Sequence, residues 1–245
     1  MKNAMKYTTL AATVLLTGLA LGSHSVYAED ETSGDGASVQ SVGTISYITD
    51  DSSVDPVDPL DPTKPIQPTD PDVPAPTAGP LSIDYVSSLR FGEQKTTGTD
   101  MTYHAQLDHI IDSEGNEIDR PNFVQVTDKR GSNAGWHLSV TQDEQFKCDS
   151  DVLQGAELTL NNGTLSTPNE GTAPFVNQGI TLTPGEASDV MDAKEDQGTG
   201  TWLDRFGNDE EEGKDSVSLF VPGKTKKVQG EYKTTLTWAL TDAPA

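Results

Sequence analysis

The feature that most constrains the fold is the alternation of large and small side chains near the end of the chain. Between residues 231 and 241, every second position carries a large or β-branched side chain: Tyr232, Thr234, Leu236, Trp238 and Leu240. The intervening positions are Lys, Thr and Ala. This period-two alternation predicts a half-buried β-strand, and Thr, Tyr and Trp are residue types that pleated surfaces favour. We expect this segment to be the closing strand of a sheet.

The triplet Trp-x-Leu occurs twice, at residues 136–138 and 238–240. In both copies the two large side chains share one face of the predicted strand, about 7 Å apart along it. Val140 extends the same face in the first copy. An indole ring beside a leucine is a large apolar surface, so it needs cover from a hydrophobic core or from a ligand. The candidate site residues are therefore Trp136, Leu138, Trp238 and Leu240.

From residue 81 onward the sequence is typical of short strands separated by turns. The strand candidates are 81–86, 89–91, 101–107, 122–127, 135–141, 156–160, 179–182, 200–206, 216–221 and 231–241. No segment sustains the 3.6-residue period of an amphipathic helix. Short strands with frequent turns favour a sandwich or a barrel. The sequence therefore predicts an all-β fold, a β-sandwich-like single domain.

The first 28 residues have the organisation of a secretory signal peptide. Two lysines precede an uncharged apolar run, and a small-x-small cleavage site ends at Ala28. Residues 29–37 are acidic and rich in Gly and Ser, which predicts a flexible N-terminus. Residues 38–245 are expected to form the β domain, beginning with an alternating strand at residues 39–49.

A proline-rich segment interrupts this domain at residues 50–80. Prolines recur at every third position from Pro56 to Pro74, and several of them follow an aspartate. Polyproline II has three residues per turn, so the spacing predicts an extended linker or surface loop with charge along one edge. About twenty residues at ~3.1 Å each would span roughly 60 Å. We expect a semi-rigid excursion between the first and second strands.

The charge of the chain restricts its partners. It carries 16 Lys and Arg against 39 Asp and Glu, a formal charge of −23, and loss of the two signal-peptide lysines takes this to −25. Nucleic acids and anionic lipids bind basic patches, so neither is an expected partner. No apolar stretch reaches spanning length, so no membrane span is expected. The single cysteine, Cys148, cannot form an internal disulfide.

The two Trp-x-Leu triplets carry a resemblance to a known family. The first stands in Gly135-Trp-His-Leu138 and the second in Leu236-Thr-Trp-Ala-Leu-Thr-Asp-Ala-Pro244. The segment Val126-Thr-Asp-Lys-Arg-Gly131 and the Asp-Pro-rich stretch support the resemblance. On these residues the chain resembles the WxL-domain surface proteins of low-GC Gram-positive bacteria, over essentially residues 38–245.

The resemblance implies a non-catalytic secreted protein, held non-covalently on the cell wall by binding peptidoglycan. The alternative is a subunit of a surface adhesion complex whose main contact is a partner surface protein. The sequence has no sortase-type Leu-Pro-x-Thr-Gly motif and no lipoprotein cysteine at the cleavage site, which agrees with non-covalent attachment. The expected location is secreted, at the cell wall and cell surface.

Two interpretations of the Trp-x-Leu residues remain open. In the first, Trp136 and Trp238 fill the core, and the triplets specify the fold. In the second, one or both indole rings line a surface that stacks against sugar rings. Trp202 is a secondary aromatic candidate that we expect in the core or at its rim.

Catalysis and metal binding find little support in the sequence. His104 and His109 are five residues apart, which does not place them on one strand face, and His137 is expected to be exposed opposite Trp136. Acidic side chains cluster at 143–144, 149–151, 192–196 and 209–212. None of these clusters follows EF-hand spacing, so they predict solvated turns, with weak Ca²⁺ binding as the alternative. We therefore expect no enzyme activity, no cofactor, and no catalytic or metal-binding residue.

Overall fold

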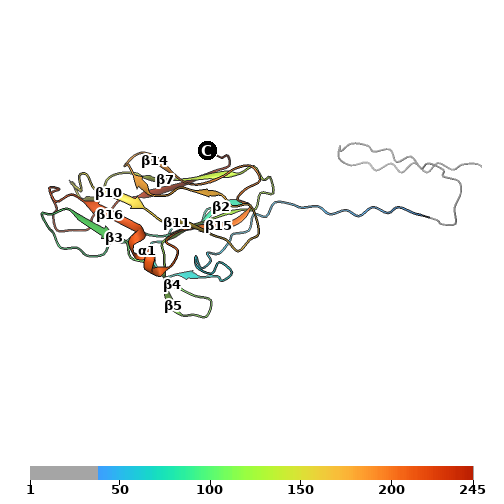
Figure 1. Cartoon of the computed structure of the whole chain (residues 1–245), viewed down its shortest axis with the longest axis horizontal. Helices are drawn as coiled ribbons and strands as arrows, with labels where there is room; N and C mark the ends of the chain where they lie inside the picture. Colours follow the sequence, from blue (N-terminus) through green and yellow to red (C-terminus); the bar gives the residue numbers. More distant parts are fainter. Residues whose placement is uncertain (1–37, 245) are drawn as a thin grey trace, which may run out of the picture. The chain divides into compact units, whose positions relative to one another are not determined.

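The computed structural model describes residues 38–244, so the predicted signal peptide and the predicted flexible N-terminus at 29–37 lie outside the described residues. The described residues fall into two units, divided between Ile45 and Ser46. Of the first unit, residues 38–45 are described, and they are exposed and outside any strand. Every helix and strand of the described residues belongs to the second unit (Figure 1).

The second unit is built mainly from three four-stranded antiparallel sheets, which confirms the predicted all-β fold. One has the order β13-β10-β16-β3, made by Ile180–Leu182, Glu157–Leu160, Val217–Val221 and Met101–His104. Another has the order β11-β15-β6-β2, made by Gly163–Ser166, Gly200–Phe206, Phe123–Asp128 and Leu81–Val86. The third has the order β12-β14-β7-β17, made by Phe175–Val176, Ala187–Ala193, Trp136–Gln142 and Leu236–Thr241. Both triplets lie in this third sheet, which is called the Trp-x-Leu sheet below.

Smaller elements complete the unit. A three-stranded sheet has the order β1-β4-β5, made by Gln67–Pro68, Asp108–Ile111 and Glu117–Arg120. Lys147–Cys148 and Asp151–Val152 pair as β8 and β9. One helix, α1, runs from Glu210 to Ser216. Among the described residues, no helix has the length and apolar character needed to cross a membrane.

One hydrophobic core joins the three large sheets. It takes buried side chains from all of them, for example Leu158 from β10, Val126 from β6 and Leu138 from β7. A second, smaller cluster contains Tyr85 and Phe123, whose rings stack with centroids 4.4 Å apart. The two clusters lie on opposite faces of β2, β6 and β15, because successive residues of these strands join different clusters. The successive pairs are Tyr85 and Val86, Phe123 and Val124, and Trp202 and Leu203. Burial on both faces explains why β6 is buried at every position.

Part of the proline-rich segment packs on this second cluster. Ile66 is buried there, and Gln67–Pro68 forms β1 against β4. Val57 bridges to Pro65, so the chain turns back on itself between them. Of the two predicted alternatives, an extended linker or a loop, residues 57–68 therefore do not form the extended linker: they fold back against the sheet. Proline spacing reports the local backbone preference, whereas the apolar residues between the prolines draw the segment onto the sheet.

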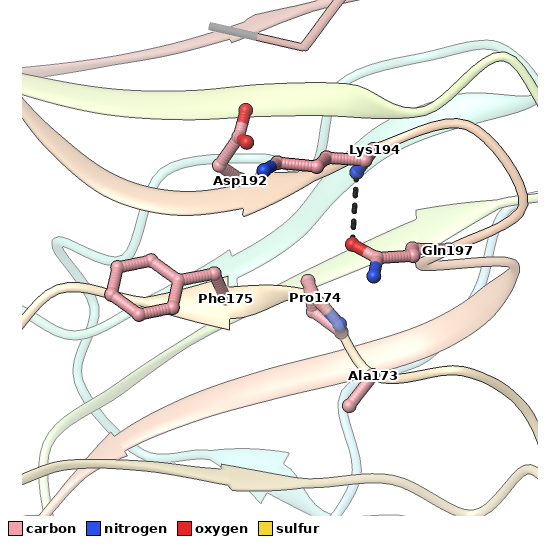
Figure 2. A pocket seen from close by; sticks show the side chains of 6 residues that line it. All are labelled: Ala173, Pro174, Phe175, Asp192, Lys194 and Gln197. Atoms are coloured by element: carbon pink, nitrogen blue, oxygen red, sulfur yellow. Dashed lines mark hydrogen bonds between the residues drawn. The ribbon is translucent and has the colours of Figure 1, made fainter.

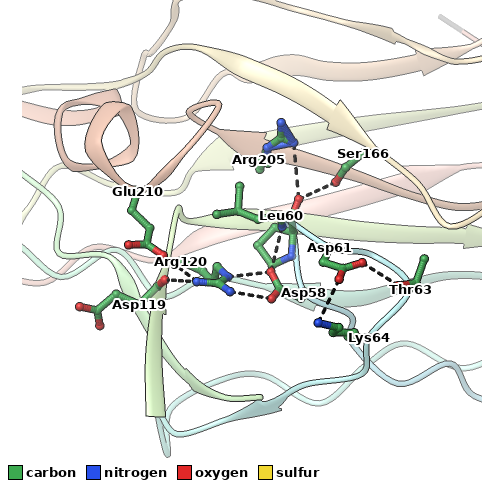
Figure 3. Close-up of polar contacts among 11 residues, drawn as sticks. Asp58, Leu60, Asp61, Thr63, Lys64, Asp119, Arg120, Ser166, Arg205 and Glu210 are labelled. Atoms are coloured by element: carbon green, nitrogen blue, oxygen red, sulfur yellow. Dashed lines mark hydrogen bonds and ion pairs between the residues drawn. The ribbon is translucent and has the colours of Figure 1, made fainter. Parts of the chain in front are cut away.

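An ion pair fixes the turn of this segment. The Asp58 carboxylate is buried and accepts two hydrogen bonds from the Arg120 guanidinium, at 2.7 and 2.9 Å (Figure 3). Ser166 donates to the carbonyl oxygen of the neighbouring Pro59 at 2.9 Å. Bidentate pairing of this kind is both strong and geometrically specific. The segment is thereby held to β5 and β11, far away in the sequence.

Two expected strands are not present. Residues 38–49 contain no strand and are exposed throughout, so the strand predicted at 39–49 is wrong in this structure. Residues 89–91 are also outside any strand. Conversely, the acidic run at 209–212 was expected to be a solvated turn, but it starts α1, with the Asp209 side chain accepting from the backbone N–H of Glu212 as an N-cap.

Candidate functional site

The two Trp-x-Leu triplets lie next to each other in the Trp-x-Leu sheet. β17 pairs antiparallel with β7, with Trp238 opposite Val140 and Leu240 opposite Leu138. The apolar faces of the two predicted strands therefore merge into one surface. The sequence predicted both strands but not that they would be neighbours, because pairing between distant segments leaves no local periodicity.

This merged surface faces the core. Trp136 and Leu138 are 0% exposed, and the indole Nε1 of Trp136 donates to the carbonyl oxygen of Gly198 at 2.9 Å. Trp238 and Leu240 are partly buried and pack against the same core. All four candidate site residues thus lie on the inner face of the sheet.

Glycine is required on one side of the Trp136 ring. Gly198 has a φ of +72°, and a Cβ there would lie 2.6 Å from the Trp136 Nε1 atom. Gly135, with a φ of +78°, would place a Cβ 2.2 Å from the carbonyl oxygen of Ala193. Neither position has space for a side chain: the Gly198 backbone lies directly against the indole, and the Gly135 backbone lies against that of Ala193 and Lys194.

Trp202 is also a core residue. Its side chain lies in the main core at 3% exposure, and its Nε1 donates to the carbonyl oxygen of Thr199 at 3.1 Å. Like Trp136, it has its indole N–H paired with a backbone carbonyl, as buried tryptophans usually do.

The outer face of the Trp-x-Leu sheet has a different composition. One row of directly opposed residues crosses all its strands, from Phe175 through Asp192 and His137 to Thr241. Because directly opposed residues of antiparallel strands share a face, these four side chains lie on the side away from Trp136. Polar groups and one aromatic ring are therefore aligned across the sheet.

His137 lies between two carboxylates in this row. Its Nε2 is 3.2 Å from an Asp189 oxygen, and its Nδ1 is 3.6 Å from an Asp192 oxygen. The imidazole was expected to be exposed, but its side chain is only 13% exposed, because β14 brings both aspartates beside it. The prediction that His137 lies on the face opposite Trp136 is confirmed, and the prediction that it is exposed is wrong.

A hollow of about 610 Å³ opens at the β12 and β14 side of this face (Figure 2). Its lining residues are Ala173, Pro174, Phe175, Asp192, Lys194 and Gln197. Phe175 is 62% exposed. An aromatic ring, a carboxylate, an ammonium group and an amide at one open site provide both an apolar surface and hydrogen-bonding groups.

Sequence reasoning missed Phe175, Asp189 and Asp192 as site residues. A register shift in β14 between Asp189 and Met191 puts both Val190 and Met191 into the core. The bulge breaks the period-two pattern by which the strand would have been found. Phe175 lies on a strand of two residues, which is too short to show any period.

Buried carboxylates occur elsewhere in the second unit. Burial raises the pKa of Asp108 to about 6, although hydrogen bonds from Ser87, Tyr85 and Asn122 oppose this shift. Burial also raises the pKa of Asp204 to about 8. Among residues 38–244, no three His, Cys, Asp or Glu side chains gather in a way that would hold a metal ion.

The family model for the WxL domain, described as a surface cell wall-binding domain, matches residues 34–244. The chain therefore belongs to the WxL-domain family, and its location is the cell wall and surface. Searches of curated proteins and of solved structures find no match. The WxL domain is a cell wall-binding module and not a catalytic family.

Proposed function

We propose that the chain attaches non-covalently to the wall by binding peptidoglycan through the outer face of the Trp-x-Leu sheet. Family membership supports wall binding. The burial of Trp136 and Leu138 argues against a direct contact between these two side chains and the wall. The observation that carries the proposal is the hollow beside Phe175, on the outer face of the family's signature sheet.

The chemistry of that hollow suits a glycan. Aromatic rings stack on the C–H faces of sugars, and Phe175 offers its ring at 62% exposure. The same hollow is lined by the polar groups of Asp192, Lys194 and Gln197, which are of the kinds that exchange hydrogen bonds with hydroxyl and amide groups. Peptidoglycan offers both sugar rings and amide-bearing groups, so the two sets of contacts match.

Sedimentation with insoluble peptidoglycan tests this proposal. The mature protein should appear in the pellet. Phe175→Ala should weaken the affinity about tenfold, the equivalent of ~1.4 kcal/mol, and should therefore lower the bound fraction at a fixed protein concentration. Met101→Ala is the matched control, because Met101 is also an exposed apolar residue but lies on β3 of another sheet. Equal sedimentation of Phe175→Ala and wild type would refute this assignment of the site.

A second candidate function is a subunit of a surface adhesion complex whose main contact is a partner protein. The formal charge of −23 favours it, since a strongly acidic surface attracts a basic partner. Mixing the purified components without wall material separates the two candidates. A stable complex that forms while sedimentation with peptidoglycan fails would favour the partner protein.

A further inference from the structure

The segment at residues 38–49 has an unusual surface. It contains no charged residue, although the chain as a whole is 22% charged. Its five large apolar side chains are between 77% and 96% exposed: Val39, Val42, Ile45, Tyr47 and Ile48. Contiguous exposed apolar residues on a soluble protein mark a surface that another partner covers.

The same segment has the composition of a strand. It is rich in Val, Ile, Thr and Tyr, and it lies outside any strand in this structure. The family match begins at residue 34, so the segment is part of the WxL domain pattern and not an unrelated leader. A strand-forming sequence without a strand neighbour has unpaired backbone groups along both edges.

An open strand edge is present in the second unit. Within the described residues, β17 has one strand neighbour, β7. The backbone N–H of Asp143 donates to the carbonyl oxygen of Thr235, so these two opposed residues, one position beyond the ends of β7 and β17, are a hydrogen-bonded pair. Hydrogen-bonded and non-hydrogen-bonded pairs alternate in antiparallel strands, so the backbone groups of alternate β17 residues point to the open edge. Those residues are Leu236, Trp238 and Leu240.

This edge lacks the usual protection against pairing. Residues 234–241 contain no charge and no proline, two features that commonly prevent an edge strand from pairing with another chain. Several other edges are protected: β13 has three residues, β5 is charged, and Thr77 covers β2 through hydrogen bonds with Ile83. The edge strands β3 and β11 also lack proline, Asp, Glu, Lys and Arg, but each has only four residues, whereas β17 has six.

The core also reaches the surface at β17. Trp136, Leu138 and Val140 of β7 are 0% exposed, whereas Trp238 and Leu240 on the adjacent strand are only partly buried. One more strand beside β17 would cover the remaining exposed part of these side chains. Burial of that apolar surface would add to the free energy of the backbone hydrogen bonds.

We propose that residues 39–49 of one copy pair, as an added strand, with the open edge of β17 in a second copy of the chain. Each molecule carries an unpaired strand-forming segment of eleven residues and, in the six residues of β17, an open edge that such a segment is long enough to cover, so the two halves of the contact come from the same sequence. Both halves are uncharged, and like charges therefore do not oppose each other within the contact, despite the net charge of −23.

Light scattering of the mature protein over a range of concentrations tests the proposal, in about 0.5 M salt to screen the net charge. The wild type should show a mass above the monomer that rises with concentration. The double variant Ile45→Lys, Tyr47→Lys should associate at least about tenfold more weakly. Both side chains are exposed, so the change should leave the fold intact. Gln94→Lys, Thr96→Lys is the matched control: it adds the same charge at two exposed positions outside the segment and outside any strand, and it should associate like the wild type.

Hydrogen exchange identifies the edge. The backbone amides of Leu236, Trp238 and Leu240 should gain protection in the associated form and lose it in the Ile45→Lys, Tyr47→Lys variant. A wild type that is monomeric at every concentration overturns the proposal, and protected amides in that monomer would mean that the segment docks on its own chain. Association that leaves these amides unprotected also overturns it. None of these measurements requires wall material, so their outcome is independent of peptidoglycan binding.

Discussion

The two faces of the Trp-x-Leu sheet differ sharply in what they carry. The inner face bears Trp136, Leu138 and Val140, all 0% exposed. The outer face bears His137, Asp192 and the exposed ring of Phe175. The same strands supply both faces, since successive residues point to opposite sides. The residues that make the family recognisable are therefore on the core side of the sheet.

This difference separates recognition of the fold from recognition of the ligand. A buried indole with its N–H paired to the Gly198 carbonyl oxygen tolerates few substitutions, so such a residue marks a fold in a sequence. An outward residue such as Phe175 has no such packing constraint, so the fold does not dictate its identity. We infer that the Trp-x-Leu residues form the scaffold and that their outward neighbours make the contacts.

The largest expected effect comes from Trp136→Ala. Removing a fully buried indole should lower the free energy of unfolding by about 3–5 kcal/mol, through the lost burial and the cavity that remains. The Gly198 carbonyl oxygen would also lose its donor. Urea unfolding followed by circular dichroism measures this loss. Trp136→Phe keeps the apolar ring but not the N–H, and it should cost less. A Trp136→Ala variant that unfolds like the wild type would contradict the core assignment of the inner face.

The pH dependence of stability tests the one carboxyl on the core side of β15. Asp204 is 0% exposed, and burial raises its pKa to about 8, above the usual 3.8. The folded state therefore holds this proton more tightly than the unfolded state. The free energy of unfolding should fall as pH rises from about 5 to about 8, by roughly 1 kcal/mol per pH unit.

Asp204→Asn isolates that contribution. The variant cannot ionise at this position, so the difference between its urea midpoint and that of the wild type should change with pH over the same window. Asp108, whose pKa is raised to about 6, acts in the same direction in both proteins and cancels in the difference. A difference that stays constant from pH 5 to pH 9 would exclude a buried, protonated Asp204.

Trp238→Ala should have an intermediate effect on stability, which would distinguish the edge of the inner face from its fully buried part. Trp238 is partly buried at the sheet edge, so its loss removes less core contact than that of Trp136. We expect about 2 kcal/mol, measured by the same urea unfolding. If both tryptophan variants lost equal stability, the edge position of β17 would have to be given up.

The strand pattern was largely predictable, because period-two alternation is a local property. The predicted strands at 81–86 and 200–206 coincide with β2 and β15, and the one at 135–141 differs from β7 by one residue. The predicted strand at 39–49 failed since a strand needs a neighbour, which a local pattern cannot supply. The sheet order and the hollow also depend on contacts between distant segments.

The proline-rich segment and the acidic stretches show the limit of composition. Asp58 has the sequence context of a solvated rod, yet Arg120, 62 positions away, holds it buried. Asp192 belongs to a cluster expected in a solvated turn, but it lies near the end of β14, an inner strand of the sheet, with its side chain on the outer face. A charged side chain is expected to be exposed only if no oppositely charged side chain pairs with it. Such a partner can be distant in the sequence, so the local sequence does not show it.

The smallest expected effect, and the sharpest contrast between the two faces, comes from two adjacent residues of β12. Phe175 points outward and is 62% exposed, whereas Val176 packs against the core. Phe175→Ala removes the larger side chain but should change the free energy of unfolding by no more than about 0.5 kcal/mol. Val176→Ala removes two methyl groups from a packed site and should cost about 1 kcal/mol. Thermal and urea unfolding of both variants give the comparison directly. If loss of the phenyl ring destabilised the protein more than loss of the methyl groups, Phe175 would be part of the core and the outer face would lose its aromatic contact.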